Sequence, residues 1–318
     1  MRPSFVAAVL ASTLLAPPAL AAATSTASSA SNAAAPVPCA VIADPARDAR
    51  HPASNRQVLI LSHGEGMNAL LMLAAGPGPK PTMLLHGLPG NEQNLDLAQA
   101  VRRAGWNVLT MHYRGSWGSP GRFSLAGTYD DVEVAMAWLR QPAHARQYGI
   151  DSGRLVIAGH SMGGFLAARY AAAHDDVAGA VLIDPWNVGA SGKAVLAKPE
   201  GRQDAIAAMG DDLGNSLAGT DAATLMAEAE RHAGDWDLLD AAPKLVRTPL
   251  LVVDAQYGNA RQVAPLVAAI RAGSKPVAGQ LKAVTLASDH AFADHRIALA
   301  GVTVNWLDGL RRAVAKPK

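Results

Sequence analysis

The stretch "LVIAGHSMGGFLAARYAAAH", from Leu155 to His174, decides the fold. An apolar run ends at Ala158, glycines then stand on both sides of Ser161, and a helix-forming segment follows. A sharp turn from strand to helix strains the backbone of its central residue, and flanking glycines remove the Cβ atoms that would collide there. The pattern predicts a serine hydroxyl presented at a helix N-terminus, where developing negative charge is favoured. In this context a Gly-x-Ser-x-Gly turn indicates that the serine is a nucleophile. The alternative is a serine that only helps to form the turn.

The rest of the chain alternates short apolar runs with helix-like segments joined by short connections. This alternation predicts an α/β fold with a mostly parallel central sheet that is covered by helices on both faces. The first two runs, separated by a Gly-containing turn at residues 63–66, predict an antiparallel hairpin at the start of the fold. The predicted strands cover residues 57–62, 68–76, 81–87, 106–115, 154–159, 177–185, 248–255 and 281–288.

One segment interrupts the alternation. Residues 187–244 contain no strand-like run, and their helix-like pieces would lie over the strand ends as a small helical cap. A cap in this place is expected to act as a lid on the site, and a peripheral helical pair without a role is the alternative.

A serine hydroxyl is a poor nucleophile unless a neighbouring base takes its proton. Ligands of such sheets bind beyond the carboxyl ends of the strands, so the base is expected just after a late strand. "LASDHAFADHR" places His290 close to the end of the last strand, and His295 further along at the start of the final helix. We therefore predict that His290 is the base; a solvated loop histidine is the alternative.

An acidic residue must hold the imidazole in the correct tautomer. Asp254 ends the run "TPLLVVD" and yields the chain order Ser161, Asp254, His290, which is the order of α/β-hydrolase triads. Asp184, at the end of "AVLID", is the competing candidate. The sequence favours Asp254 and leaves Asp184 open.

Two backbone N–H groups are expected to bind the oxyanion. In "LLHGLPGNEQN" the chain turns just after a strand, and the amide of Leu88 could converge with that of Met162, which directly follows the serine. Such donors stabilise the charge that develops on the substrate oxygen during acyl transfer. An ordinary Pro-Gly turn is the alternative.

The 318 residues are nearly balanced in charge, with 28 Lys and Arg against 26 Asp and Glu. No dense basic run indicates nucleic-acid binding. The histidines are scattered along the chain rather than clustered, and no phosphate-binding loop is present, so we predict neither a metal nor a cofactor. The N-terminus "MRPSFVAAVLASTLLAPPALA" predicts a signal peptide over residues 1–21 and hence a secreted or periplasmic protein, with a short membrane anchor as the alternative. A flexible Ser/Thr/Ala-rich linker is predicted over 22–40 and one domain over 41–318. No later segment predicts a membrane span, and Cys39, the single cysteine, excludes an intrachain disulfide.

With these residues in view, the chain resembles the α/β-hydrolase superfamily, and within it bacterial esterases and acylaminoacyl-peptidase-like serine hydrolases. The resemblance covers residues 58–314 and rests on four segments in the family's order: "HGLPGNEQNLDLA", "YRGSWGSPGRFS", "GHSMGGFLAARYA" and "DHAFADHR". It implies catalytic roles for Ser161 and His290 and oxyanion roles for Leu88 and Met162. It also implies that the segment with Tyr113, Arg114 and Ser116 lines the substrate site.

One departure from the family's pattern concerns the acid. Relatives usually carry it a few residues beyond the strand, where this chain has Gln256, Tyr257 and Gly258, so that Asp254 comes early. The expected function is hydrolysis of small carboxylic esters through an acyl-enzyme. The alternatives are cleavage of a short peptide or acyl-amino acid amide, and a non-catalytic binding protein on the same fold.

Overall fold

The computed structural model describes residues 36–85, 87–273 and 280–314. The predicted signal peptide and most of the predicted linker lie outside the described residues. The folded part begins before residue 41, because the short helix α1 (Cys39–Ile42) packs against α2 and α11, and Arg103 Nε donates to the carbonyl of Ala40 at 2.6 Å. Among the described residues no helix is both long and apolar enough to span a membrane.

An eight-stranded sheet forms the centre, in the order β1-β2-β4-β3-β5-β6-β7-β8. β1 and β2 form the predicted antiparallel hairpin, β2 also pairs antiparallel with β4, and the remaining pairs are parallel. The predicted α/β sheet is therefore confirmed. The strands are β1 (Ser54–Ser62), β2 (Glu65–Leu73), β3 (Thr82–Leu85), β4 (Asn107–Met111), β5 (Val156–His160), β6 (Gly179–Ile183), β7 (Leu250–Ala255) and β8 (Leu281–Leu286).

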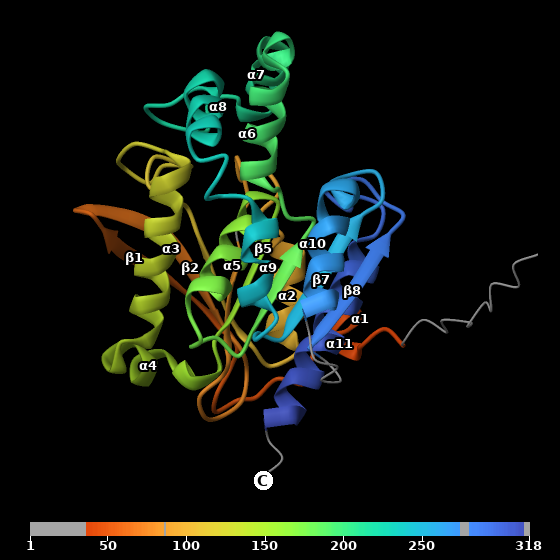
Figure 1. Cartoon of the computed structure of the whole chain (residues 1–318). Coiled ribbons are helices and arrows are strands. Elements are labelled where there is room, and N and C mark those ends of the chain that lie inside the picture. The colour runs from red at the N-terminus through yellow and green to blue at the C-terminus, as the bar shows by residue number, and fades with distance from the viewer. Residues whose placement is uncertain (1–35, 86, 274–279, 315–318) are drawn as a thin grey trace, which may run out of the picture. The chain divides into compact units, whose positions relative to one another are not determined.

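Helices cover both faces of the sheet and enclose two apolar cores (Figure 1). Because β5, β6 and β7 are buried on both faces, they read as continuous apolar runs rather than as alternating ones. On one face lie α3 (Leu125–Arg140), α4 (Pro142–Tyr148), α5 (Met162–Ala173), α9 (Leu238–Leu245) and α10 (Ala260–Gly273); on the other lie α1, α2 (Leu95–Arg103) and α11 (Arg296–Val314).

The cap is smaller than the predicted segment 187–244. It consists of α6 (Val188–Ala197), α7 (Arg202–Leu213) and α8 (Ala222–Arg231), which stand together at one end of the fold (Figure 1). The rest of the segment forms α9, which packs against α5 and α10 beside the sheet. α8 and α9 are separate helices, because residues 232–236 form a turn between them.

Hydrogen bonds tie the cap to the body of the fold. Glu228 of α8 is buried, and its two carboxylate oxygens each accept an N–H from the first turn of α3, at Leu125 and Ala126, at 2.8 Å. The loop between α7 and α8 exchanges backbone hydrogen bonds with Gly115, Trp117 and Phe123. A carboxylate at a helix N-terminus is favourably placed, so the cap is held in position at these points.

Candidate active site

Ser161 occupies the predicted turn between β5 and α5. Its backbone has φ 57° and ψ −118°, a conformation that is strained for a residue with a side chain. Strand and helix approach so closely that a Cβ on Gly159 would lie 2.1 Å from the carbonyl carbon of Gly163. Only glycine fits at this position, which explains why residue 159, two before the serine, is a glycine. Ser161 is 7% exposed and lines a cavity beyond the strand ends.

His290 lies in the loop after β8 and lines the same cavity as Ser161. Its Nδ1 is 2.5 Å from Oδ2 of Asp184, a carboxylate that is fully buried at the end of β6. A carboxylate can only accept a hydrogen bond, so Nδ1 carries the proton and Nε2 keeps its lone pair. This is the tautomer that a general base needs. The alternative histidine, His295, instead contacts Asp294 at the start of α11.

The structure places Asp184, and not Asp254 as the sequence favoured, in contact with His290. The Asp184 carboxylate accepts backbone N–H groups from Ala255 at 2.9 Å and from Asn259 at 3.0 Å. Asn259 also donates its side-chain amide to the carbonyl of Asp184 at 3.1 Å. The loop after β7, where relatives carry the acid, therefore serves here as a cradle for a carboxylate that comes from β6.

Asp254 is the residue that this geometry leaves out. It lies within β7, opposite Thr285 of β8, and at the same level of the sheet as Asp184 on the neighbouring strand, because Ile183 pairs with Val253. Burial raises the pKa of Asp254, and its Oδ1 has no hydrogen-bond partner among the described residues. Among the described residues, Nδ1 of His290 is bonded to Asp184, and no hydrogen bond joins the imidazole to Asp254.

His160, the residue before the serine, contacts the backbone and the ring of His290. Its side chain is 5% exposed, its Nε2 is 2.7 Å from the carbonyl oxygen of His290, and the two rings lie 4.5 Å apart. Because a carbonyl accepts, Nε2 of His160 donates. Burial, followed by repulsion from His290, lowers the pKa of His160 to about 4. His160 thus stays neutral and fixes the backbone that carries the base.

We expect this buried histidine to make folding pH-dependent. The unfolded chain protonates His160 near its ordinary pKa of 6.5, whereas the folded chain resists protonation until about pH 4. The unfolded state therefore binds more protons in this window, and the free energy of unfolding falls as the pH is lowered. Urea titrations at pH 7.5 and 4.5 should show wild type losing on the order of 3 kcal/mol more than His160→Gln. Parallel losses in the two proteins would contradict this assignment.

The candidate oxyanion residues stand beside the serine. Leu88 lines the cavity, and Met162 is the first residue of α5, where a backbone N–H has no partner within the helix. The indole Nε1 of Trp117 donates to the carbonyl of Pro89 at 2.5 Å and so holds the loop that carries Leu88. The oxyanion roles of Leu88 and Met162 remain predictions.

Tyr113 and Arg114 do not line this cavity, contrary to what the resemblance implied. Tyr113 is 2% exposed within the core. Arg114 binds Asp131 of α3, with Nε 2.5 Å from Oδ1 and its backbone N–H donating to Oδ2 at 2.9 Å. Their segment has a supporting role, because it bonds to the loop between α7 and α8 and also carries Trp117.

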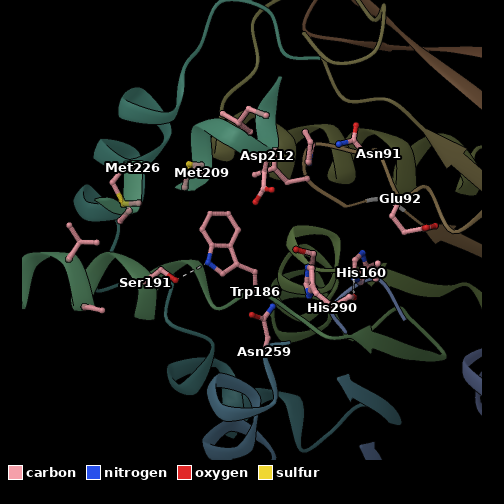
Figure 2. Close-up of a pocket in the computed structure, with 18 residues that line it drawn as sticks. Asn91, Glu92, His160, Trp186, Ser191, Met209, Asp212, Met226, Asn259 and His290 are labelled. Atoms are coloured by element: carbon pink, nitrogen blue, oxygen red, sulfur yellow. Dashed lines mark hydrogen bonds between the residues drawn. The ribbon is translucent and has the colours of Figure 1, made fainter. Parts of the chain in front are cut away.

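The cavity has a volume of about 650 Å³ and lies between the strand ends and the cap. Figure 2 shows the indole of Trp186 in its middle, with side chains from all three cap helices around it. Sequence reasoning did not single out Trp186 or Asn259, although both closely follow a strand end. The cap contributes Ser191, Ala194, Val195, Ala205, Met209, Asp212, Leu213 and Met226.

Within the described part of the chain, no group of three or more His, Cys, Asp or Glu side chains is arranged to hold a metal ion.

Residues 80–225 match the family described as "alpha/beta hydrolase fold". A segment of 115 residues is 30% identical to a multifunctional-autoprocessing repeats-in-toxin protein of Vibrio cholerae; it represents 35% of this chain and only 2% of that protein.

Solved structures resemble the chain over most of its length. An esterase of Pyrococcus furiosus has a TM-score of 0.55 at 15% identity, with 81% of this chain and 90% of that chain covered. An acylaminoacyl peptidase of Pyrococcus horikoshii has a TM-score of 0.58 at 14% identity, with 80% of this chain and 41% of that chain covered. At such identities the likeness concerns the fold. The chain has the α/β-hydrolase fold, and the resemblance to that superfamily, inferred from its motifs, is confirmed.

Proposed function

We propose that this protein is a serine hydrolase that cleaves small carboxylic esters through an acyl-enzyme. The observation that carries the proposal is the 2.5 Å contact between His290 Nδ1 and Asp184 Oδ2, with His290 and Ser161 lining one cavity. A nucleophile, a base in the correct tautomer and a buried acid are the three parts that acyl transfer to serine needs.

The proposed reaction has two halves. His290 Nε2 takes the proton of Ser161 Oγ as that oxygen attacks the ester carbonyl, and Asp184 stabilises the imidazolium. The amides of Leu88 and Met162 bind the oxyanion. Collapse of the tetrahedral intermediate breaks the bond to the alcohol, which leaves with the proton from His290. Water, deprotonated by His290, then attacks the acyl carbonyl, the bond to Ser161 Oγ breaks, and Oγ takes the proton back from His290 as the carboxylic acid is released.

Chromogenic substrates test this proposal directly. Purified protein is assayed with p-nitrophenyl acetate, butyrate and octanoate and with aminoacyl p-nitroanilides, beside Ser161→Ala and a fluorophosphonate probe. Ester turnover and probe labelling that both disappear in Ser161→Ala are the expected result. Anilide turnover would move the assignment to amide hydrolysis. A protein that turns over no substrate and stays unlabelled would be a binding protein on this fold.

We further propose that the chain is exported, because its first 21 residues have the charge, apolar stretch and small-residue end of a signal peptide. Expression of the full chain, followed by cell fractionation and N-terminal sequencing, should yield an extracytoplasmic protein that begins near residue 22. An intact N-terminus in the cytoplasmic fraction would contradict export.

A further inference from the structure

The charged residues that line the active-site cavity are of one sign. Glu92 and Asp212 are acidic, and among the described residues that line the cavity none is Lys or Arg. Glu92 is already balanced, because Arg296 lies 3.6 Å from it and the backbone N–H of Asn94 donates to it at 2.7 Å. Asp212 has no ion pair or hydrogen bond within the described part of the chain. The cavity lining therefore includes one exposed carboxylate, that of Asp212, without a counter-charge among the described residues.

The position of Asp212 in its helix adds to that charge. Asp211 and Asp212 lie in the last turn of α7, which has no basic residue in this turn. The C-terminal end of a helix carries partial negative charge, where cations are favoured and carboxylates are not. The Asp212 carboxylate therefore does not stabilise its own helix. The negative charge of the carboxylate and the partial negative charge of the helix end both favour a cation in the cavity.

An aromatic ring lies in the same cavity as Asp212. Figure 2 shows the Asp212 carboxylate extending from α7 toward the indole of Trp186, which comes from the loop after β6. Trp186 Nε1 donates to Ser191 Oγ at 2.8 Å, which fixes the plane of the ring. Among aromatic side chains, the face of Trp attracts cations most strongly. The neighbouring thioethers of Met209 and Met226 complete a polarisable and otherwise apolar wall.

We propose that Trp186 and Asp212 form a subsite for an alkylammonium group, so that the preferred substrates are esters with a quaternary or protonated amine. This inference rests on the proposed serine hydrolase function and specifies its substrate class. The ring would contact the methyl or methylene groups around the nitrogen, while Asp212 offsets the charge. Because the subsite lies in the same cavity as Ser161, the ammonium group would belong to the hydrolysed molecule itself, in its alcohol half or its acyl half.

Pairs of isosteric esters test this subsite. Butyrylcholine is compared with 3,3-dimethylbutyl butyrate for the alcohol half, and p-nitrophenyl 4-(trimethylammonio)butanoate with p-nitrophenyl 5,5-dimethylhexanoate for the acyl half. In one pair we expect kcat/KM for the charged ester to exceed that for its neutral isostere by about tenfold. The pair that shows the preference identifies the half of the substrate that carries the amine.

Matched variants distinguish binding at the subsite from a general electrostatic effect of negative charge near the cavity. Asp212→Asn should reduce the charged-to-neutral ratio to near one, whereas Asp211→Asn, which alters an adjacent carboxylate that does not line the cavity, should leave it within about twofold of wild type. Trp186→Leu should also lower the ratio, and Trp186→Phe, which retains an aromatic face, should restore part of it.

A binding measurement distinguishes failure of the subsite from failure of the catalytic proposal. Calorimetry with Ser161→Ala measures the dissociation constants of the same ester pairs without turnover. If the charged ester binds more tightly than its neutral isostere, and the double variant Ser161→Ala/Asp212→Asn loses this difference, the subsite is supported. This holds even if the wild-type protein hydrolyses no ester and is not labelled by the fluorophosphonate probe. Equal binding of both members in both pairs, or equal loss in the Asp211→Asn and Asp212→Asn variants, would overturn it.

Discussion

Replacing Asp184 by Asn should lower kcat for ester hydrolysis by about ten-thousandfold, as loss of the acid does in related triads. The carboxylate accepts N–H groups from Ala255, Asn259 and His290 at once. An asparagine has one acceptor oxygen in place of two, so either a backbone amide loses its partner or the NH₂ group faces Nδ1. In the second case the proton moves to Nε2, and His290 can no longer accept the proton of Ser161.

The matched control is Asp254→Asn, which makes the same isosteric change in a buried carboxyl one strand away. We expect kcat to stay within about fivefold of wild type, because Asp254 lies inside β7 and its pKa is already raised by burial. Steady-state kinetics with p-nitrophenyl butyrate, together with thermal unfolding to verify folding, tests both variants. If Asp254→Asn were the inactive variant and Asp184→Asn the active one, the assignment of the acid would be wrong.

Gly258→Ala should reduce kcat by about a hundredfold or more, although it changes no catalytic group. A Cβ at this position would lie 2.3 Å from Asp184 Oδ2 and 3.1 Å from the Cα of His290. The carboxylate cannot give way, because the backbone amides of Ala255 and Asn259 hold it. The added methyl group must therefore push acid and base apart, and a displacement of about 1 Å in such a site costs on the order of a hundredfold in rate.

Gly309→Ala is the control for this variant. Gly309 is exposed on α11, and a Cβ there would meet no atom within 4 Å, so we expect full activity and a stability gain of up to about 1 kcal/mol. Kinetics and urea unfolding of both variants distinguish the effects. Gly258→Ala with wild-type kcat would mean that the loop after β7 can move without disturbing the pair, and the cradle would then be unimportant.

Several elements could not be read from local sequence. α10 was not predicted, because Pro265 interrupts its helical pattern and its amphipathic face is decided by packing. The end of the cap was placed too late, since α9 is as helical in sequence as α8 and differs only in what it packs against. The substrate role expected for Arg114 also failed, because its partner Asp131 is 17 residues away.

The sequence by itself determined the succession of strands along the chain, the opening hairpin, the turn around Ser161 and the position of His290 just after the last strand. These features depend on short-range patterns: apolar runs, glycines where backbones approach closely, and polar residues just after strands. Only the tertiary structure decided between Asp184 and Asp254. Both aspartates close an apolar run, but Asp184 follows the last residue of β6 whereas Asp254 lies inside β7. The two stand at the same level of neighbouring strands, because Ile183 pairs with Val253. Asp184 has left its strand with a φ of 40°, and the amides of a loop 75 residues away hold its carboxylate on the imidazole, whereas Asp254 still pairs with Thr285 of β8.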